Sequence, residues 1–445
     1  MDGNDMFDPL DPLRVDRELS LLARRWVRYR RRLRQGEGFD DAPFASSSVA
    51  GRTAFTAVSE LPDEDPLKVP LGRWIYRLAE QRINQGALVE QCRSWREQRH
   101  AVDVPERGRF SLAELLARAL ADRPRRRAWA DQLVRLGAER TAATARLWER
   151  RQEIARRLGL ESPDPIERAC LGSETAASRW LAATDALAAE FRAPSLADFL
   201  TTALAEDASE GWPARTGLRP LLELLNEHDL FRSLAIDAGP LPEPISGSSY
   251  LRAFARIGAA WVDATAPRDQ PFVIAHDPYG LRRRTVGALF ALLALNPAFL
   301  RRKLGLGRDR LRDQRRALAR AVLLHSRSCA LRLLLREAAL ASGSRFGAEY
   351  ESLLMRVHGI GAPPAAAGVV FRPRVDDDQR FSGLLLGQAE QERLVDAHDE
   401  DWFRNPRAVD QLRSEAQRSP VPTTTLEELG EGQAALLRLL LAALG

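Results

Sequence analysis

The residues with the clearest potential for chemistry lie between positions 248 and 306. This stretch holds the chain's only His-Asp-Pro sequence, His276-Asp277-Pro278, and a triplet of arginines at 282–284. A His-Asp pair can serve acid–base chemistry, and clustered guanidinium groups can bind an anion through paired hydrogen bonds. The simpler interpretation of the His-Asp pair is a helix-entry turn, with Asp277 as the cap and Pro278 in the first helical turn.

The remaining histidines and cysteines do not have the spacing of a metal or nucleophile site. None of the six His is paired with another at i+3 to i+5, and the three Cys are far apart, so no metal-ligand pattern is evident. Ser248 and Ser249 lack the neighbours of an activated nucleophile. His325 lies on an apolar helix face, which predicts a histidine packed in the core.

Two apolar helical runs, 250–262 and 285–295, lie on either side of the His-Asp-Pro sequence and the arginine triplet and must position them. Gly258 stands between Ile257 and Ala259 in the first run, where a small residue lets another backbone approach closely. We therefore expect two neighbouring buried helices, with Gly258 at their closest contact.

Five short motifs follow one another in this half of the chain: FARIGAAW at 254–261, DP at 277–278, ALF at 288–290, NPAFL at 296–300 and WFRNPRA at 402–408. Their order and spacing resemble those of gluzincin metallopeptidases of the thimet-oligopeptidase and Taq-carboxypeptidase type. That family has a phrase like F-H-E-x-G-H-A-L, then a D-P-x-x-T-E-x-x-A-x-L-F-E helix, a P-x-W-L motif and a C-terminal W-W-x-N-P-x-A phrase. The resemblance covers roughly residues 248–413.

The resemblance implies a relative that has lost its zinc site. Ala255 and Ala259 stand where the family has its zinc histidines, and Arg256 stands where it has the general-base Glu. The third ligand would fall near Arg284, and Phe381 occupies the kind of position where an oxyanion-stabilising Tyr is expected. A methyl group cannot ligate zinc, and a guanidinium cannot accept a proton at neutral pH. We therefore expect no catalytic residue, no bound metal and no cofactor.

The former zinc site defines a candidate pocket, for which two interpretations stay open. The arginines could replace the charge of the metal by pairing with carboxylates, and we predict such a pair for Arg256. Alternatively, a basic pocket could hold an anion such as the C-terminal carboxylate of a peptide. The candidate residues are Ala255, Arg256, Ala259, His276, Asp277, Tyr279, Arg282, Arg283 and Arg284.

Composition limits the function classes. No apolar run reaches 18 residues and the segment 1–13 is acidic, so neither a membrane span nor a signal peptide is expected. The sparse cysteines favour a reduced, cytoplasmic setting. The net charge of +5 and the pI of about 9.5 suggest an acidic partner. However, only two of the 66 basic residues are Lys, a bias that together with the heavy Ala and Leu usage indicates codon preference rather than nucleic-acid binding.

A second candidate is the basic surface of a helix predicted over 16–35. It could bind phosphates, but we favour a solvated face whose arginines pair with nearby Asp and Glu. The residues of this candidate surface are Arg28, Arg30, Arg31, Arg32 and Arg34.

Helical periodicity predicts a mostly α-helical protein without a series of strands. Besides 16–35, the long predicted helices are 69–100, 125–158, 173–191, 309–341, 381–398 and 426–444. We predict an acidic tail at 1–13, a helical N-terminal lobe at 14–238 and a peptidase-like lobe at 248–445, with a Pro/Gly-rich linker at 239–247. The resemblance implies an oligopeptidase-like fold with two lobes around a central cleft.

The function that these features favour is a catalytically inactive, metallopeptidase-like protein that binds a peptide or protein, or acts as a scaffold. One alternative is a hydrolase with non-standard site residues such as His276 and Asp277. The other is an Arg-rich binder of nucleic acid or an acidic protein through 24–34.

Overall fold

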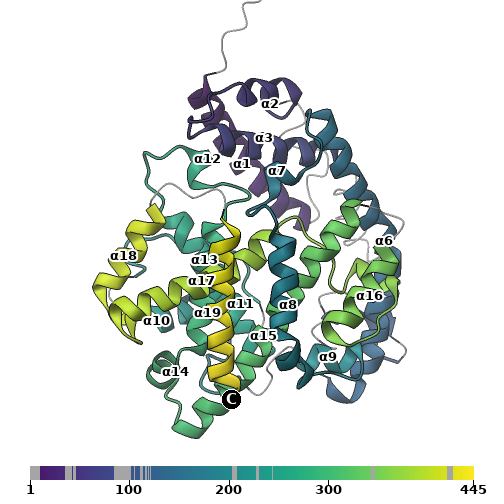
Figure 1. The fold of residues 1–445 in the computed structure, drawn as a ribbon, viewed down its shortest axis with the longest axis vertical. Coiled ribbons are helices and arrows are strands. Elements are labelled where there is room, and N and C mark those ends of the chain that lie inside the picture. The colour runs from purple at the N-terminus through teal and green to yellow at the C-terminus, as the bar shows by residue number, and fades with distance from the viewer. Residues whose placement is uncertain are drawn as a thin grey trace, which may run out of the picture. The chain divides into compact units, whose positions relative to one another are not determined.

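The computed structural model of the chain is mostly helical (Figure 1). It describes residues 11–35, 43, 47–84, 102–104, 106–110, 114–115, 118, 120, 122–202, 208–226, 230–242, 244–341, 346–417 and 424–445. Three long helices, α6 (Arg126–Arg157), α15 (Arg308–Ala341) and α19 (Leu426–Leu444), begin and end within one residue of the predicted bounds. The mostly α-helical class is thus confirmed.

The other helices were predicted less completely. Within the described residues they are α1 (Pro12–Gln35), α2 (Arg52–Ser59), α3 (Lys68–Ile83), α7 (Asp164–Glu167), α8 (Ser173–Ala189), α9 (Leu196–Thr202), α10 (Leu218–Leu225), α11 (Gly247–Thr265), α12 (Phe272–Ala275), α13 (Arg282–Leu292), α14 (Pro297–Leu304), α16 (Phe346–His358), α17 (Asp377–His398) and α18 (Pro406–Gln417). Four 3-10 turns accompany them: η1 (Arg123–Arg125), η2 (Leu293–Leu295), η3 (Pro364–Gly368) and η4 (Trp402–Arg404). The second half of the predicted helix 69–100 lies outside the described residues. No described helix has both the length and the apolar character that crossing a membrane requires.

A small antiparallel hairpin was not predicted from the sequence. Strands β1 (Val102–Val104) and β2 (Gly108–Phe110) pair so that Val102 lies opposite Phe110. Gly108 has a φ of 95° in the turn, a left-handed conformation that glycine adopts without strain.

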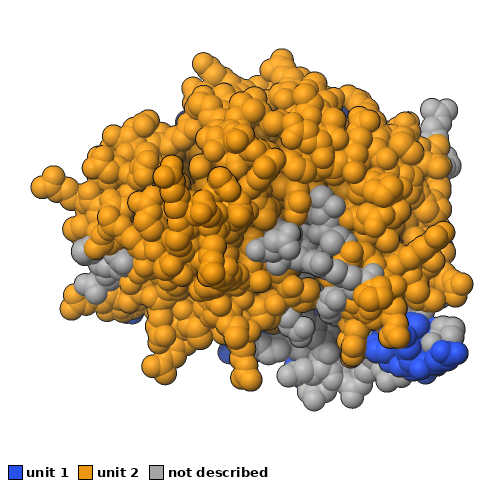
Figure 2. All heavy atoms as spheres, turned by 90° about the horizontal axis from the view of Figure 1, so that it is seen from below, with its two compact units in different colours: residues 1–111, 144–168, 267–279 blue, residues 112–143, 169–266, 280–445 orange. Residues whose placement is uncertain are grey.

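The contacts within the chain divide it into two compact units, coloured separately in Figure 2. Unit 1 comprises residues 1–111, 144–168 and 267–279, and unit 2 comprises 112–143, 169–266 and 280–445. The predicted linker 239–247 lies within the 169–266 segment of unit 2.

In unit 1, α3 contacts α1, α2, α7 and α12. The core of this unit includes Trp74, Ile75 and Leu78 of α3, all nearly inaccessible to solvent. Asp16 of α1 is also buried. Its carboxylate accepts hydrogen bonds from the backbone N–H groups of Phe272 and Val273 at 3.1 and 2.8 Å. These two bonds satisfy free N–H groups at the start of α12.

In unit 2, helices α11, α13, α17 and α19 pack successively against one another, and α15 contacts α8, α16 and α17 (Figure 1). Aromatic side chains fill the space beside α11, where Trp261 and Phe290 have ring centroids 6.0 Å apart. The indole N–H of Trp261 donates to the Leu230 carbonyl at 2.8 Å, so this fully buried ring leaves no unsatisfied donor.

The predicted contact between the two central helices is confirmed. A Cβ atom placed on Gly258 of α11 would lie 2.7 Å from the Val286 carbonyl oxygen and 3.0 Å from Gly287 Cα, both on α13. A Cβ on Gly287 would in turn lie 2.7 Å from the Ala255 carbonyl oxygen. The two backbones approach this closely only because neither residue has a side chain.

We expect Gly258→Leu to lower the free energy of unfolding by about 1–3 kcal/mol, because the obstructing atoms belong to backbone and cannot rotate away. Urea or thermal unfolding of the full chain measures this effect. Gly430→Leu is the matched control, since Gly430 is also helical but a Cβ there meets no atom within 4 Å. Equal stability of the Gly258 variant and wild type would contradict the close contact.

Candidate functional site

Unit 2 contains a cavity of about 170 Å³ lined by α11, α13, α15 and α17. Its apolar lining includes Leu251, Leu292, Val322 and Leu384. The polar side chains at the cavity are Ser248, Arg252, Arg283, Arg284, His325 and Arg380. The cavity therefore combines an apolar surface with a concentration of positive charge.

Helix α11 contributes one of its faces. Ser248, Leu251, Arg252 and Ala255 are spaced by three or four residues, which places them on one side of a helix. The Arg252 guanidinium donates to the hydroxyl groups of Ser248 at 3.3 Å and Ser249 at 3.1 Å. No carboxylate in the described part of the chain pairs with it. Arg252 is thus held by neutral groups alone.

Two effects lower the pKa of Arg252. Burial of the guanidinium disfavours its charged form, and the nearby charge of Arg256 adds to this. An arginine nevertheless stays protonated at neutral pH. Its full charge therefore faces the cavity region without a counter-ion from the described residues.

Helix α13 begins with the arginine triplet, and its first turn contains no acidic residue. Positive charge at a helix N-terminus is opposed by the helix dipole. Arg283 forms an ion pair with Asp263 at 2.9 Å, and Arg284 forms one with Asp376. Burial lowers the pKa of Arg284 to about 10, and the charge of Arg380 contributes in the same direction.

Arg380 of α17 shares the Asp376 carboxylate, at a distance of 2.9 Å. Burial alone would raise the pKa of Asp376, but the guanidinium groups of Arg284 and Arg380 outweigh it and hold the pKa far below its usual range. The Nε atom of Arg380 is buried without a hydrogen-bond partner among the described residues. Asp376 therefore neutralises only part of the charge beside it.

Helix α15 brings a histidine and a thiol to the same region. His325 is exposed and lines the cavity, so the prediction of a core histidine is wrong. Its Nε2 lies 3.6 Å from Sγ of the fully buried Cys329, one turn along the helix, and Arg332 Nη2 lies 3.1 Å from the same sulfur. Burial would raise the pKa of Cys329, but the charges of His325 and Arg332 lower it to about 7.

The structure brings together three of the candidate pocket residues predicted from the sequence. Ala255, Arg283 and Arg284 all line the cavity. Ala259 is half-buried and is not part of the lining, and Arg282 lies 3.7 Å from Glu415 in a separate ion pair.

The carboxylate partner predicted for Arg256 is wrong. Its side chain is exposed and donates to the backbone carbonyl of Pro240, and no carboxylate of the described residues pairs with it. Arg256 follows Arg252 by one helical turn and is only about 40° from it around the helix. It is not part of the cavity lining, however, and its guanidinium donates to the Pro240 carbonyl instead.

His276, Asp277 and Tyr279 belong to unit 1 and take part in its internal contacts. The Asp277 carboxylate pairs with Arg73 at 2.5 Å and accepts the Tyr279 backbone N–H at 2.9 Å. The backbone carbonyl of His276 accepts the indole N–H of Trp74 at 2.9 Å. Asp277 therefore stabilises a turn, but α13 begins only at Arg282, so the predicted helix entry at Pro278 is wrong.

The candidate basic surface is described only in part. Arg28 and Arg32 are exposed on α1, whereas the side chains of Arg30, Arg31 and Arg34 lie outside the described residues.

Sequence reasoning missed four polar residues of the cavity. Arg252 could have been found, because it precedes Ala255 by three residues on the predicted helix 250–262, whereas Ser248 lies two residues before that predicted start. His325 and Arg380 come from helices far along the chain, and no local pattern connects them with α11.

Within the described residues, no group of three or more His, Cys, Asp or Glu side chains is arranged to hold a metal ion. Comparison with protein-family models and with curated proteins gives no match for this chain. The arguments below therefore start from the cavity itself.

Proposed function

We propose that this chain is a binding protein whose cavity in unit 2 holds the anionic group of a peptide or protein partner. The observation that carries the proposal is the charge balance of the lining. Within the described residues, three of the four guanidinium groups at the cavity, those of Arg283, Arg284 and Arg380, form ion pairs with two carboxylates, of Asp263 and Asp376, and that of Arg252 forms none. The surplus positive charge favours binding of an anion that the described residues do not themselves supply.

Arg252 is the residue best suited to bind that anion. The guanidinium groups of Arg283, Arg284 and Arg380 are already engaged by carboxylates, whereas among the described residues that of Arg252 donates to the Ser248 and Ser249 hydroxyl groups alone. A guanidinium binds a carboxylate through two parallel N–H···O bonds. Exchanging two neutral acceptors for a carboxylate would thus strengthen its hydrogen bonds and supply a counter-charge.

The size and lining of the cavity favour a small amphipathic group. A cavity of about 170 Å³ is similar to the ~150 Å³ cavity that accommodates benzene. The aliphatic side chains of Leu251, Leu292 and Val322 can pack against an apolar body while the arginines bind its charge. A peptide C-terminus has both parts, an apolar last side chain and a free carboxylate.

We also propose that the chain is a catalytically inactive relative of the gluzincin peptidases. Support comes from the positions equivalent to the first and third zinc ligands, Ala255 and Arg284, which line the same cavity. The adjacency of α11 and α13 is consistent with this reading. The alternative of a hydrolase using His276 and Asp277 has less support, because the Asp277 carboxylate is already engaged by Arg73 and the Tyr279 N–H.

We expect Arg252→Ala to weaken binding of a C-terminal peptide library by about 10–100-fold, equivalent to about 1.5–3 kcal/mol for a lost charge-assisted hydrogen bond. Fluorescence anisotropy with peptides bearing free C-terminal carboxylates, compared with their C-terminal amides, measures the effect. The amides should bind wild type as weakly as the free acids bind the variant.

Arg256→Ala provides the matched control. It removes the same charge from the same helix, and both residues are exposed, but Arg256 is not part of the lining and donates to the Pro240 carbonyl. Equal loss of binding in both variants would indicate a general electrostatic effect and contradict the proposed site. Equal affinity for free acids and amides would exclude the C-terminal carboxylate as the bound group.

A further inference from the structure

A second positively charged surface lies in unit 1, on the outer side of α1. The opposite side of this helix packs into the core through buried residues that include Val15, Leu19, Leu22 and Trp26. Asp16 fixes the helix to the N-terminus of α12 by its two hydrogen bonds. The rotation of α1 about its axis is therefore set by packing, and so is the identity of the outward residues.

The outward residues form a stripe of arginines. This stripe consists of five arginines between positions 14 and 28. With about 3.6 residues per turn, they fall within an arc of roughly 100° around the helix axis, and from first to last they extend over about 21 Å of helix. All five side chains are exposed: Arg14, Arg17, Arg24, Arg25 and Arg28. We call these five residues the α1 stripe.

The α1 stripe is not neutralised by the part of the chain that the structure describes. None of its five arginines has a carboxylate partner there. The only acidic residues of α1 are Asp16, which is buried, and Glu18. From position 19 to 35 the helix has no acidic residue at all.

Several exposed arginines elsewhere in the chain pair with carboxylates, whereas others, such as Arg256, have no carboxylate partner among the described residues. Arg219 pairs with Glu223 at 2.9 Å, one turn away, and Arg438 pairs with Glu392. Arg310 likewise pairs with Glu210. A general preference for arginine explains its abundance in the chain, but not why α1 has no acidic residue from position 19 to 35. Among the described residues, Arg28 does not form the expected pair with a nearby Asp or Glu.

A row of unpaired cations along a straight helix matches a linear polyanion with regularly spaced charges. Duplex DNA carries one negative charge per ~1.7 Å of its axis, and arginines gain affinity from it by releasing condensed counter-ions. The aromatic residues of α1, Trp26 and Tyr29, are buried and offer no platform for stacking bases. The chemistry of the α1 stripe therefore fits phosphate groups and not unstacked bases.

We propose that the α1 stripe binds the phosphate backbone of double-stranded nucleic acid without reading its sequence. This inference is independent of the cavity in unit 2. The rival partner is an anionic membrane, because three aliphatic residues of α1, Leu13, Leu21 and Val27, are also exposed. The continuous apolar face of α1, which carries Leu19, Leu22 and Trp26, is however packed into unit 1 and cannot insert into lipid.

The full chain should bind a labelled 20-base-pair DNA duplex of arbitrary sequence, with an affinity that falls steeply with salt. Five phosphate contacts predict a slope of about −4.5 for log K against log salt, or roughly 500-fold weaker binding at 200 mM than at 50 mM. Replacing three stripe residues together (Arg24→Gln, Arg25→Gln, Arg28→Gln) should reduce the slope to about −1.8. Anisotropy titrations at several salt concentrations measure both slopes.

The matched control removes three exposed but paired arginines (Arg219→Gln, Arg310→Gln, Arg438→Gln) and should leave the slope unchanged. Because all six side chains are exposed, thermal melting of both triple variants should match wild type. The proposal is overturned if the chain does not bind duplex, or if both triple variants lose affinity equally. Binding to vesicles containing phosphatidylserine without binding to duplex would assign the α1 stripe to a membrane instead.

Discussion

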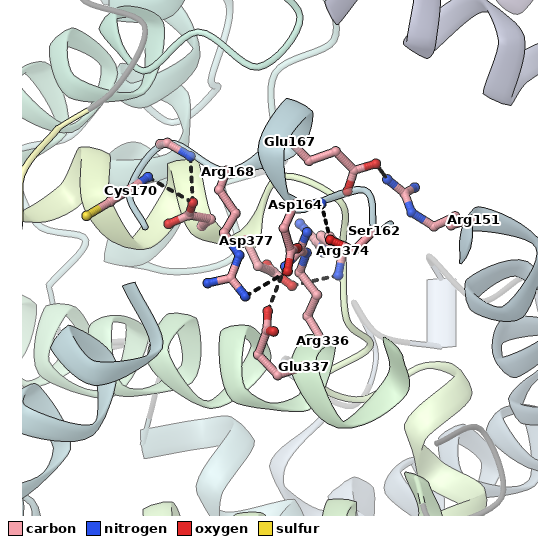
Figure 3. Close-up of polar contacts among 12 residues, drawn as sticks. Arg151, Ser162, Asp164, Glu167, Arg168, Cys170, Arg336, Glu337, Arg374 and Asp377 are labelled. Carbon is pink, nitrogen blue, oxygen red and sulfur yellow. Dashed lines mark hydrogen bonds and ion pairs between the residues drawn. The ribbon is translucent and has the colours of Figure 1, made fainter. Parts of the chain in front are cut away.

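Replacing Arg151 by Met is expected to lower the free energy of unfolding by about 3–5 kcal/mol. Arg151 lies at the centre of a buried ionic cluster in unit 1. Its Nη1 donates to Glu80 at 2.6 Å and its Nη2 donates to Glu167, as Figure 3 shows for the second of these. Both carboxylates are almost inaccessible to solvent. Without Arg151 they would stay buried with one fewer counter-charge.

The pKa shifts of the cluster agree with this account. Burial alone would raise the pKa of Glu80, but the charges of Arg151 and Arg77 outweigh burial and lower it. In the Arg151→Met variant, the remaining partner would be Arg77, which pairs with Glu80 at 2.5 Å. The same variant also removes the ion pair of the buried Glu167 with Arg151. We therefore expect the variant to recover part of its stability at acidic pH, where a carboxylate can be protonated.

Two further variants test the cause of the destabilisation. Arg157→Ala, on the same helix, removes an arginine from an exposed pair with Glu153 and should cost less than about 1 kcal/mol. A triple variant, Arg151→Met with Glu80→Gln and Glu167→Gln, should be more stable than Arg151→Met alone, because it removes the uncompensated charges. Urea unfolding at pH 7 compares all three. If the triple variant is no more stable than the single one, the loss arises from packing and not from unpaired charge.

The sequence predicted the helices of unit 2 well, because their signal is local. Helix α19 begins with a capping box in which Thr425 accepts the Glu428 N–H and Glu428 accepts the Thr425 N–H. The contact at Gly258 was also predictable, since a glycine inside an apolar helix leaves space for a neighbouring backbone. Both inferences use residues within a few turns of one another.

The candidate site was predicted only in part, because its chemistry depends on contacts distant in sequence. Asp277 is engaged by Arg73, which is 204 residues away, and no local pattern indicates that pair. Arg256 was expected in the pocket from a motif alignment, which assigns positions but not the directions of side chains. Arg252, one helical turn earlier, is the residue at the cavity, and only the arrangement of α13 and α17 around α11 distinguishes the two.

The buried His358 leads to the last prediction, a loss of stability in acid. Its ring lies between Phe199 and Phe371, with centroid distances of 4.5 and 5.3 Å. Nε2 is 3.1 Å from the Ser328 hydroxyl, and Nδ1 is buried without a hydrogen-bond partner among the described residues. Burial lowers the pKa of His358 to about 3, and the charges of Arg327 and Arg332 add to this effect. The folded protein therefore keeps this imidazole neutral.

The sign of the pH dependence follows from comparing the folded and unfolded states. An unfolded chain binds a proton at histidine below pH ~6.5, whereas folded His358 does so only near pH 3. Its contribution to stability is complete above pH ~6.5 and is lost as the pH falls from there toward 3. At pH 5 the loss amounts to roughly 2 kcal/mol, or ~1.36 kcal/mol for each pH unit.

We expect His358→Gln to remove this pH-dependent loss, because a Gln amide can still donate to the Ser328 hydroxyl but does not titrate. The variant should be less stable than wild type at pH 8, since it loses the ring contacts with Phe199 and Phe371. The difference between them should shrink by about 2 kcal/mol at pH 5. Urea unfolding at both pH values measures this change, with His398→Gln as the control because that ring is partly exposed on α17. Parallel pH curves for wild type and the His358 variant would show that this histidine is not kept neutral by the fold.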